Sequence, residues 1–165
     1  MANTRNWARA ALNRQALVHS TRTAVAAFVS LLVARIFRLP EAYWAAITTL
    51  IVMQSTLGAA LTVSWRRLEG TALGACAGAL VGSCFSPSLL LFAVVVFGIG
   101  MLAAALRLDR TAYRFASITL AIIMLIERSE PAWVIAAHRF VEVSVGIAVG
   151  LALTAIWPEP SLSEE

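Results

Sequence analysis

The sequence of 165 residues has little charge and no lysine at all. Only 13% of its residues are charged, about half the share found in ordinary soluble domains, whereas 60% are hydrophobic. A disordered chain carries more charge and less apolar surface, so disorder is excluded, and a soluble globular fold is strongly disfavoured. The length leaves room for one domain. The composition therefore predicts a single-domain membrane protein.

Cysteine, histidine and aspartate are also scarce, which argues against most enzyme and metal chemistry. Cys76 and Cys84 lie eight residues apart in one apolar run, about 12 Å along a helix, too far for an intrachain disulfide. We expect both to be buried apolar side chains. Asp109 is the only aspartate, and the chain contains no GxSxG motif and no phosphate-binding glycine loop. We therefore expect no enzymatic activity, no metal and no cofactor.

All 13 basic side chains are arginines, and they lie in small groups between apolar runs. This spacing is typical of the loops of a multi-spanning membrane protein, not of a nucleic-acid-binding patch. Prolines and arginine clusters divide the chain into six apolar segments, which predicts an all-α integral membrane protein with six transmembrane helices. The predicted spans cover residues 23–39, 43–64, 69–86, 88–106, 112–127 and 132–156.

The arginines also predict how the chain is oriented in the membrane. Nine lie in the N-terminal segment and the second and fourth connections, against four in the other three connections with their flanks. Loops rich in arginine lie preferentially on the cytoplasmic side of a membrane. This distribution therefore places both termini in the cytoplasm. Residues 1–21 are then an amphipathic helix on the cytoplasmic surface, and residues 159–165 form a cytoplasmic tail.

The two halves of the chain resemble each other. Residues 47–53 (ITTLIVM) match residues 118–124 (ITLAIIM) at an offset of 71. At an offset of 72, the pairs are Arg35 with Arg107, Arg38 with Arg110, Arg67 with Arg139, Gly74 with Gly146, and Gly78 with Gly150. Each repeat would contain three spans, so the two copies would cross the membrane in opposite directions. Inverted repeats are typical of transporters, with the path near their interface; chance similarity between apolar helices is the alternative.

Glycine recurs every fourth residue in two of the predicted spans. The positions are Gly70, Gly74, Gly78 and Gly82 in one span, and Gly146 and Gly150 in another. Such spacing gives a helix one smooth face, on which another helix can pack closely. Close helix packing is the favoured interpretation, and a narrow path lined by backbone is the alternative.

Arg139 and Glu142 are one helical turn apart, so their side chains can pair. Glu142 lies nine residues after Trp133, about 13 Å along a helix and close to the middle of a bilayer. An ionisable group at that depth usually faces protein or water. It indicates either a site that couples transport to protons or a structural ion pair, and the sequence leaves both open.

Three arginines are candidate anion contacts, because guanidinium groups bind carboxylates well. These are Arg35, Arg67 and Arg139, with Gln54 and Thr71 as polar candidates along the same path.

The segment from Tyr43-Trp44 through LIVMQSTLGAALTVSWRRLEGTALGA resembles the fusaric acid resistance (FUSC) and aromatic acid exporter superfamily, over about residues 22–158. The matching positions are Trp44, Arg67, Gly70, Thr71 and Gly74. The resemblance implies a six-helix module of the bacterial inner membrane that exports aromatic or other organic carboxylates. A lone module would need a second copy to enclose a path, so we expect a homodimer. The alternatives are a membrane scaffold or assembly subunit that transports nothing, and a passive anion channel.

Overall fold

The computed structural model describes residues 14–86, 88–126 and 130–157, and every regular element in these ranges is an α-helix. The helices are α2 (Arg14–Ile36), α3 (Tyr43–Val52), α4 (Leu57–Cys84), α5 (Leu89–Ala105), α6 (Arg110–Leu125) and α7 (Ala132–Ile156). The all-α class is therefore confirmed. Most of the helix predicted at residues 1–21, and the whole tail at 159–165, lie outside the described residues.

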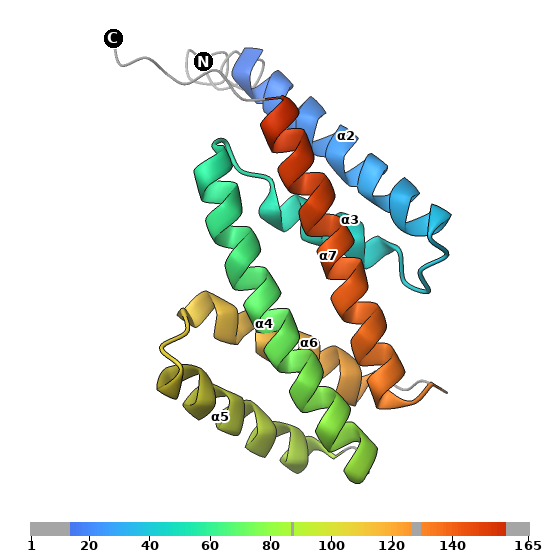
Figure 1. Ribbon diagram of the computed structural model, residues 1–165, viewed down its shortest axis with the longest axis vertical. Helices are drawn as coiled ribbons and strands as arrows, with labels where there is room; N and C mark the ends of the chain where they lie inside the picture. Colours follow the sequence, from blue (N-terminus) through green and yellow to red (C-terminus); the bar gives the residue numbers. More distant parts are fainter. Residues whose placement is uncertain (1–13, 87, 127–129, 158–165) are drawn as a thin grey trace, which may run out of the picture.

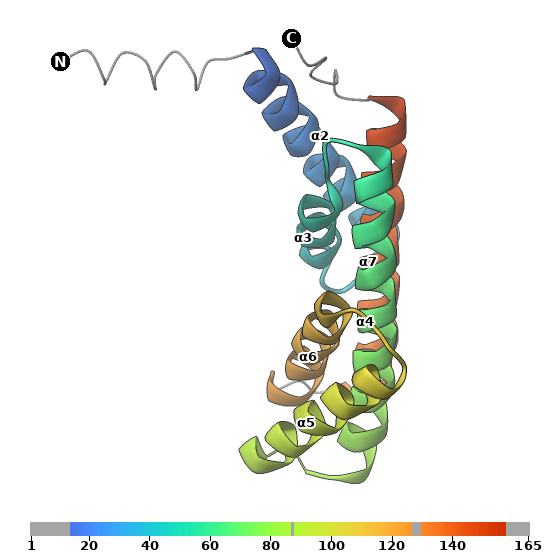
Figure 2. The same cartoon turned by 90° about the vertical axis from the view of Figure 1, so that its left-hand side faces the viewer.

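The helices form two layers, one of which is a pair of long helices (Figures 1 and 2). α4 and α7 run side by side along the molecule, and the other four helices lie on one side of this pair (Figures 1 and 2). The short helix α6 packs on α4, and the short helix α3 packs on α7. α2 then covers α3 and α7, and α5 covers α6. Each long helix thus carries one short helix on the same side of the molecule.

Two glycine contacts, one in each half, hold the short helices against the long ones. Gly74 of α4 lies against the backbone of Ala116 in α6, and a β-carbon there would collide with the Ala116 carbonyl oxygen. Gly146 of α7 lies in the same way against Ala45 of α3. The two glycines are 72 residues apart and the two alanines 71. The same close approach between a long and a short helix therefore occurs twice, at the offsets found in the sequence.

The other regularly spaced glycines also lie in contacts between helices or their side chains. A β-carbon at Gly70 would meet Ala112, one at Gly78 would meet Ile123, and one at Gly82 would meet Ala132. At Gly150 it would approach Val52. These glycines thus occupy the packing positions that the favoured interpretation of their spacing requires.

α2 and α5 end in the same backbone conformation. Arg38 and Arg107 follow these helices with φ of 54° and 55°, in the left-handed region. The Leu39 N–H donates to Ala34 O (3.0 Å), and the Leu108 N–H donates to Ala103 O (2.9 Å), the pattern of a Schellman motif. Here the offset is 69, so Arg38 corresponds to Arg107 and not to Arg110. The offset rises to 71 in the next helix because Ala116 lies nine residues after Arg107, whereas Ala45 lies seven residues after Arg38.

The helix boundaries in the first half differ from the expected ones. The segment predicted as 43–64 is divided, because α3 ends at Val52 and α4 begins at Leu57. α4 then runs without interruption through residues 65–67, where we expected a connection. The Thr56 side chain accepts a hydrogen bond from the Ala59 N–H (3.3 Å), so this threonine caps α4. In α5, α6 and α7 the boundaries lie within about two residues of the expected spans.

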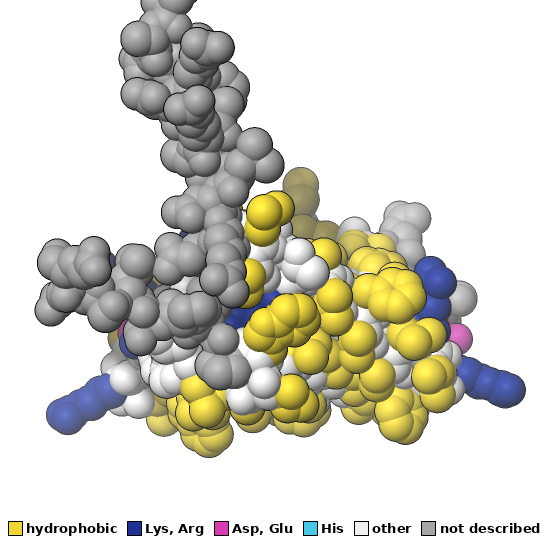
Figure 3. Space-filling view, turned by 90° about the horizontal axis from the view of Figure 1, so that it is seen from above, with side chains coloured by type: hydrophobic (Ala, Val, Ile, Leu, Met, Phe, Trp, Pro, Cys, Tyr) yellow, Lys and Arg dark blue, Asp and Glu magenta, His cyan; other side chains and the backbone are white. Residues whose placement is uncertain are grey.

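The surface of the described helices is apolar over large areas. Exposed side chains include Phe28 on α2 (66%) and Leu90 and Phe97 on α5 (77% and 70%). Seen from the end where α2 begins, hydrophobic side chains dominate the surface, and arginines extend at two opposite edges (Figure 3). Two helices, Ala16–Ile36 and Ala132–Ile156, are long and apolar enough to cross a membrane. Such a surface needs a cover of lipid or protein.

Both cysteines are exposed, which corrects the expectation that they are buried. They lie on α4, and Gly70, Gly74 and Gly78 of this helix occupy the side that faces α6. The expectation failed because a free cysteine is buried in a soluble protein to escape water. Where the exposed surface is itself apolar and covered by lipid or protein, an exposed cysteine does not face water and need not be buried.

Candidate functional site

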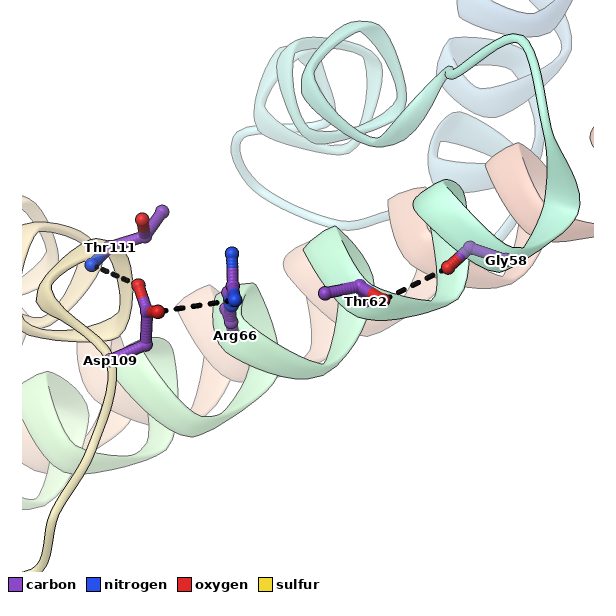
Figure 4. A network of polar contacts seen from close by, with 5 residues as sticks. All are labelled: Gly58, Thr62, Arg66, Asp109 and Thr111. Atoms are coloured by element: carbon purple, nitrogen blue, oxygen red, sulfur yellow. Dashed lines mark hydrogen bonds and ion pairs between the residues drawn. The ribbon is translucent and has the colours of Figure 1, made fainter.

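Two neighbouring arginines in the middle of α4 have opposite environments. Arg66 points toward the connection between α5 and α6, where its Nη2 lies 3.1 Å from Asp109 Oδ2 (Figure 4). Asp109 also caps α6, since its Oδ1 accepts a hydrogen bond from the Thr111 N–H at 2.7 Å. The bonds from Thr111 and the charge of Arg66 hold the pKa of Asp109 below its usual value. Both side chains are 39% exposed, so this ion pair contributes little stability.

Arg67 is buried, and it lies against α6. It is 2% exposed, and its guanidinium carbon lies 4.5 Å from the centre of the Phe115 ring, which is a cation–π contact. Within the described ranges, no carboxylate pairs with Arg67, and its Nε has no hydrogen-bond partner. The nearest acidic residue along the chain, Glu69, is two positions away and therefore on a different side of the helix.

Two hydroxyl groups share the buried face of α4 with Arg67. Ser64 precedes it by three residues and Thr71 follows it by four, so all three lie along one face of the helix. Ser64 is 4% exposed and Thr71 is fully buried. Neither hydroxyl has a hydrogen-bond partner among the described residues. A guanidinium and two hydroxyls are thus buried together with hydrogen-bonding capacity left over, which native proteins rarely tolerate without a reason.

Arg139 on α7 has a very different set of partners. It too is 2% exposed, and its guanidinium carbon lies 4.4 Å from the centre of a Trp44 ring. Its Nη1 lies 3.2 Å from Glu142 Oε2, and its Nη2 contacts the carboxylate of Glu41. The ion pair that the sequence suggested between Arg139 and Glu142 is therefore present, and Glu41 adds a second negative charge.

Glu142 has a second contact besides its ion pair. It is fully buried, and its Oε1 accepts a hydrogen bond from the Glu41 N–H at 2.9 Å. This N–H belongs to the residue before Ala42, the N-cap of α3, which supplies no side-chain cap of its own. A carboxylate close to the N-terminus of a helix also matches the helix dipole. Glu142 therefore joins α7 to the start of α3.

The two buried arginines occupy equivalent positions in the two halves. Arg67 and Arg139 are 72 residues apart, and their aromatic partners, Phe115 and Trp44, are 71 apart. Around them the residues differ in a consistent way. Moving from α4 to α7, Ser64 is replaced by Ala136, Gly70 by Glu142, and Thr71 by Val143. One half thus has an arginine with hydroxyls, and the other an arginine with carboxylates.

The structure brings only some of the predicted site residues together. Arg67 lies on one face with Thr71, and Arg139 contacts Glu142. Arg35 belongs to neither group, because it is exposed in the last turn of α2. Gln54 lies in the connection between α3 and α4, not inside a span. In the described part of the chain, no three His, Cys, Asp or Glu side chains cluster as metal ligands would.

Sequence reasoning missed the role of Arg22. We assigned it to the cytoplasmic N-terminal segment, yet it is fully buried in α2. Its Nη1 donates to Trp157 O (2.9 Å) and its Nη2 to Gln54 O (2.5 Å). Trp157 directly follows the last residue of α7, where backbone oxygens lack partners, and Gln54 lies in the connection after α3. Glu41 was missed as well, although its place between Pro40 and the predicted span could have marked it as a cap or a partner.

A comparison against protein families identifies the family of the chain. The family described as fusaric acid resistance protein-like matches residues 24–153, so the chain belongs to this family. Among curated proteins, the chain is 30% identical to the inner membrane protein YeeA of Escherichia coli K12, over 87% of this chain and 41% of that protein.

The chain is also 32% identical to the uncharacterized transporter YdhK of Escherichia coli K12, over 94% of this chain and 24% of that protein. The corresponding protein of Salmonella typhimurium is 29% identical over 87% of this chain and 22% of its own length. The chain therefore spans less than half the length of these relatives. No solved structure matches the chain.

Proposed function

We propose that the chain is a transporter-like module of the bacterial inner membrane that exports small organic anions, with aromatic carboxylates as the first class to test. The observation that carries this proposal is the buried arginine found at the same position in both halves. A buried positive charge is costly in an apolar protein and usually marks a functional or an ion-paired site. The family and the names of the relatives, a transporter and an inner membrane protein, support the same function.

The proposed architecture is six membrane spans arranged as two inverted repeats, α2–α4 and α5–α7. The contact of Gly74 with Ala116 and that of Gly146 with Ala45 support it, as do the two arginine–aromatic pairs. Substrate paths in inverted-repeat transporters lie near the interface of the repeats. Here α4 and α7 form that interface, and each carries one of the two buried arginines.

We further propose that the module works as a homodimer, since the exposed apolar side chains of α2 and α5 would be covered by a second copy or by lipid. Cross-linking in native membranes, followed by mass measurement of the purified protein in detergent, tests this state. A species of one chain only in both measurements would contradict it.

The test of function is flux in proteoliposomes made with the purified full chain. Benzoate, 4-hydroxybenzoate, acetate and succinate would be loaded inside, with an imposed pH gradient. Flux above that of empty liposomes, lost when the gradient collapses, would support a proton-coupled exporter and would justify testing Glu142→Gln for coupling. Flux that persists without a gradient and follows voltage would instead identify a channel.

Absence of flux for every anion, with folding and insertion verified, would contradict the proposal. It would favour a scaffold, in which the apolar faces of the helices bind partner helices. Co-purification of one defined membrane protein in stoichiometric amount would then support that alternative.

A further inference from the structure

Resting on the proposed function, we infer that Arg67, Ser64 and Thr71 form the anion-binding site of the module, and that it takes one carboxylate group carrying one negative charge. The three side chains lie on one buried face of α4, and each has a polar atom without a hydrogen-bond partner in the described part of the chain. A carboxylate has two oxygens, which can accept bonds from the guanidinium and from one of the two hydroxyls, since Ser64 and Thr71 are about 10.5 Å apart along the helix. The ligand would thus satisfy groups that the protein alone leaves unsatisfied.

The equivalent face of α7 shows why Arg139 is not the binding site. There the arginine already has two carboxylates, Glu41 and Glu142. The positions of the two hydroxyls hold Ala136 and Val143, which cannot bond to an anion. The same packed scaffold therefore exists in two chemical versions. On α7 the chain itself supplies the negative charges that balance Arg139. On α4 a bound anion would supply the charge that balances Arg67.

Charge balance sets the class of ligand. Arg67 offers one positive charge, and no second cationic side chain shares its buried face. Arg66, its neighbour, pairs with Asp109 on the other side of α4. A monocarboxylate would neutralise Arg67, whereas a dicarboxylate would bring a second charge into a buried site without a partner, at high cost. The site therefore selects monoanions such as benzoate over dianions such as succinate.

The contact with Phe115 orients the guanidinium of Arg67. The guanidinium rests on this ring, so its flat edge and not its face remains for the ligand. Arg67 is only 2% exposed, so the anion reaches it when α4 and α6 move apart. Gly70 and Gly74 form the contact at which these helices meet. A site that is closed between loading and release is what alternating access requires.

The first experiment compares thermal unfolding of three arginine variants of the full chain in detergent. Arg67→Met should unfold at the same or a higher temperature than wild type, because it removes a buried charge that lacks a partner. Arg139→Met should lower the unfolding temperature, since it leaves two carboxylates without their partner. Arg66→Met, one residue from Arg67 but exposed, serves as the control and should change little. A large loss of stability in Arg67→Met would show a structural role and overturn the inference.

The second experiment measures benzoate binding to the same purified proteins by calorimetry. Arg67→Met should weaken binding at least tenfold, and the pair Ser64→Ala and Thr71→Val, which copies the residues of α7, should weaken it several-fold. Arg66→Met should bind as wild type does, and succinate should bind wild type at least tenfold more weakly than benzoate. Equal binding by Arg67→Met, stronger binding of succinate, or no binding of benzoate would each overturn the inference.

The two proposals fail in different ways. Benzoate binding that depends on Arg67, without flux in proteoliposomes, would contradict the transport function and leave the binding site standing. Flux that is unchanged in Arg67→Met would retain the transport function and overturn the site.

Discussion

At the scale of single residues, the environment of a charged side chain decides its role more than its type does. Arg66 and Arg67 are neighbours, yet one forms an exposed ion pair and the other is buried on an aromatic ring. Arg22 is buried at the start of the apolar part of the chain, where it binds the carbonyl after the end of α7 and one in the connection after α3. From the sequence, all three were expected in cytoplasmic segments, because an arginine beside an apolar run usually faces the cytoplasm.

Replacing Glu142 tests the ion-paired half of the molecule. Glu142→Gln should lower the free energy of unfolding by about 3 kcal/mol, because it removes one of two charges that balance the buried Arg139. Glu142→Ala should cost more, since it also removes the acceptor of the Glu41 N–H. The measurement is denaturant-induced unfolding in mixed micelles.

Glu69→Gln provides the matched control for these two variants. Glu69 is a half-buried glutamate on the other long helix, and it should change the free energy of unfolding by less than about 0.5 kcal/mol. Equal stabilities for Glu142→Gln and Glu69→Gln would show that the buried cluster is not structural.

At the scale of helices, glycine sets how closely each long helix approaches its short partner. Gly74→Ala and Gly146→Ala should each lower stability by about 1–3 kcal/mol, because the added β-carbon meets a backbone carbonyl that cannot move freely. The two variants should behave alike, since they disturb equivalent contacts. Thermal unfolding in detergent measures both.

Gly98→Ala on α5 is the control, because a β-carbon there meets nothing within 4 Å. Alanine favours a helix over glycine by about 1 kcal/mol, so this variant should be as stable as wild type or more stable. A neutral effect at Gly74 or Gly146 would contradict the packing described above.

At the helix ends of α2 and α5, substitutions to glycine are expected to raise stability. Arg38→Gly and Arg107→Gly should each stabilise the protein by about 1 kcal/mol, because both positions have a left-handed backbone that costs an arginine about 1–2 kcal/mol. Arg35→Gly, inside the last turn of α2, should destabilise it by about 1 kcal/mol. Unfolding temperatures that fall in all three variants would contradict the assignment of these helix ends.

At the scale of the whole molecule, a few long-range contacts gather segments that were expected on one side of the membrane. Arg22 joins the first half of α2, the connection after α3 and the end of α7. Both described ends of the chain accordingly lie at the same end of the molecule (Figure 1). Glu41 before α3 likewise meets Arg139 of α7, a contact between two segments that were predicted to lie on the outer side.

This arrangement predicts that reporters placed before residue 14 and after residue 157 lie on the same side of the membrane. Both should give cytoplasmic signals: fluorescence from a green fluorescent protein fusion and no activity from a periplasmic phosphatase fusion. The matched insertion is a phosphatase in the connection at residues 85–88, which should be active. Opposite signals from the two ends would contradict both the orientation and an even number of spans.

The sequence by itself determined the all-α class, the family and the positions of α5, α6 and α7, because apolar run length and breaks by proline or charge act locally. It also determined which glycines would lie in helix contacts, since spacing by four fixes a helix face. Only the tertiary structure decided that α4 continues through Arg66 and Arg67, because the partners that stabilise these charges, Asp109 and Phe115, come from distant segments.

The tertiary structure also decided how the two equivalent arginines differ. Arg139 could be matched with Glu142 from their spacing, but Glu41 lies 98 residues away in the chain. No pattern along the chain indicates whether a buried charge has its partner, because that depends on which helices pack together. Among the residues that the structure describes, no carboxylate pairs with Arg67. This feature, on which the proposed binding site rests, is therefore a property of the folded molecule.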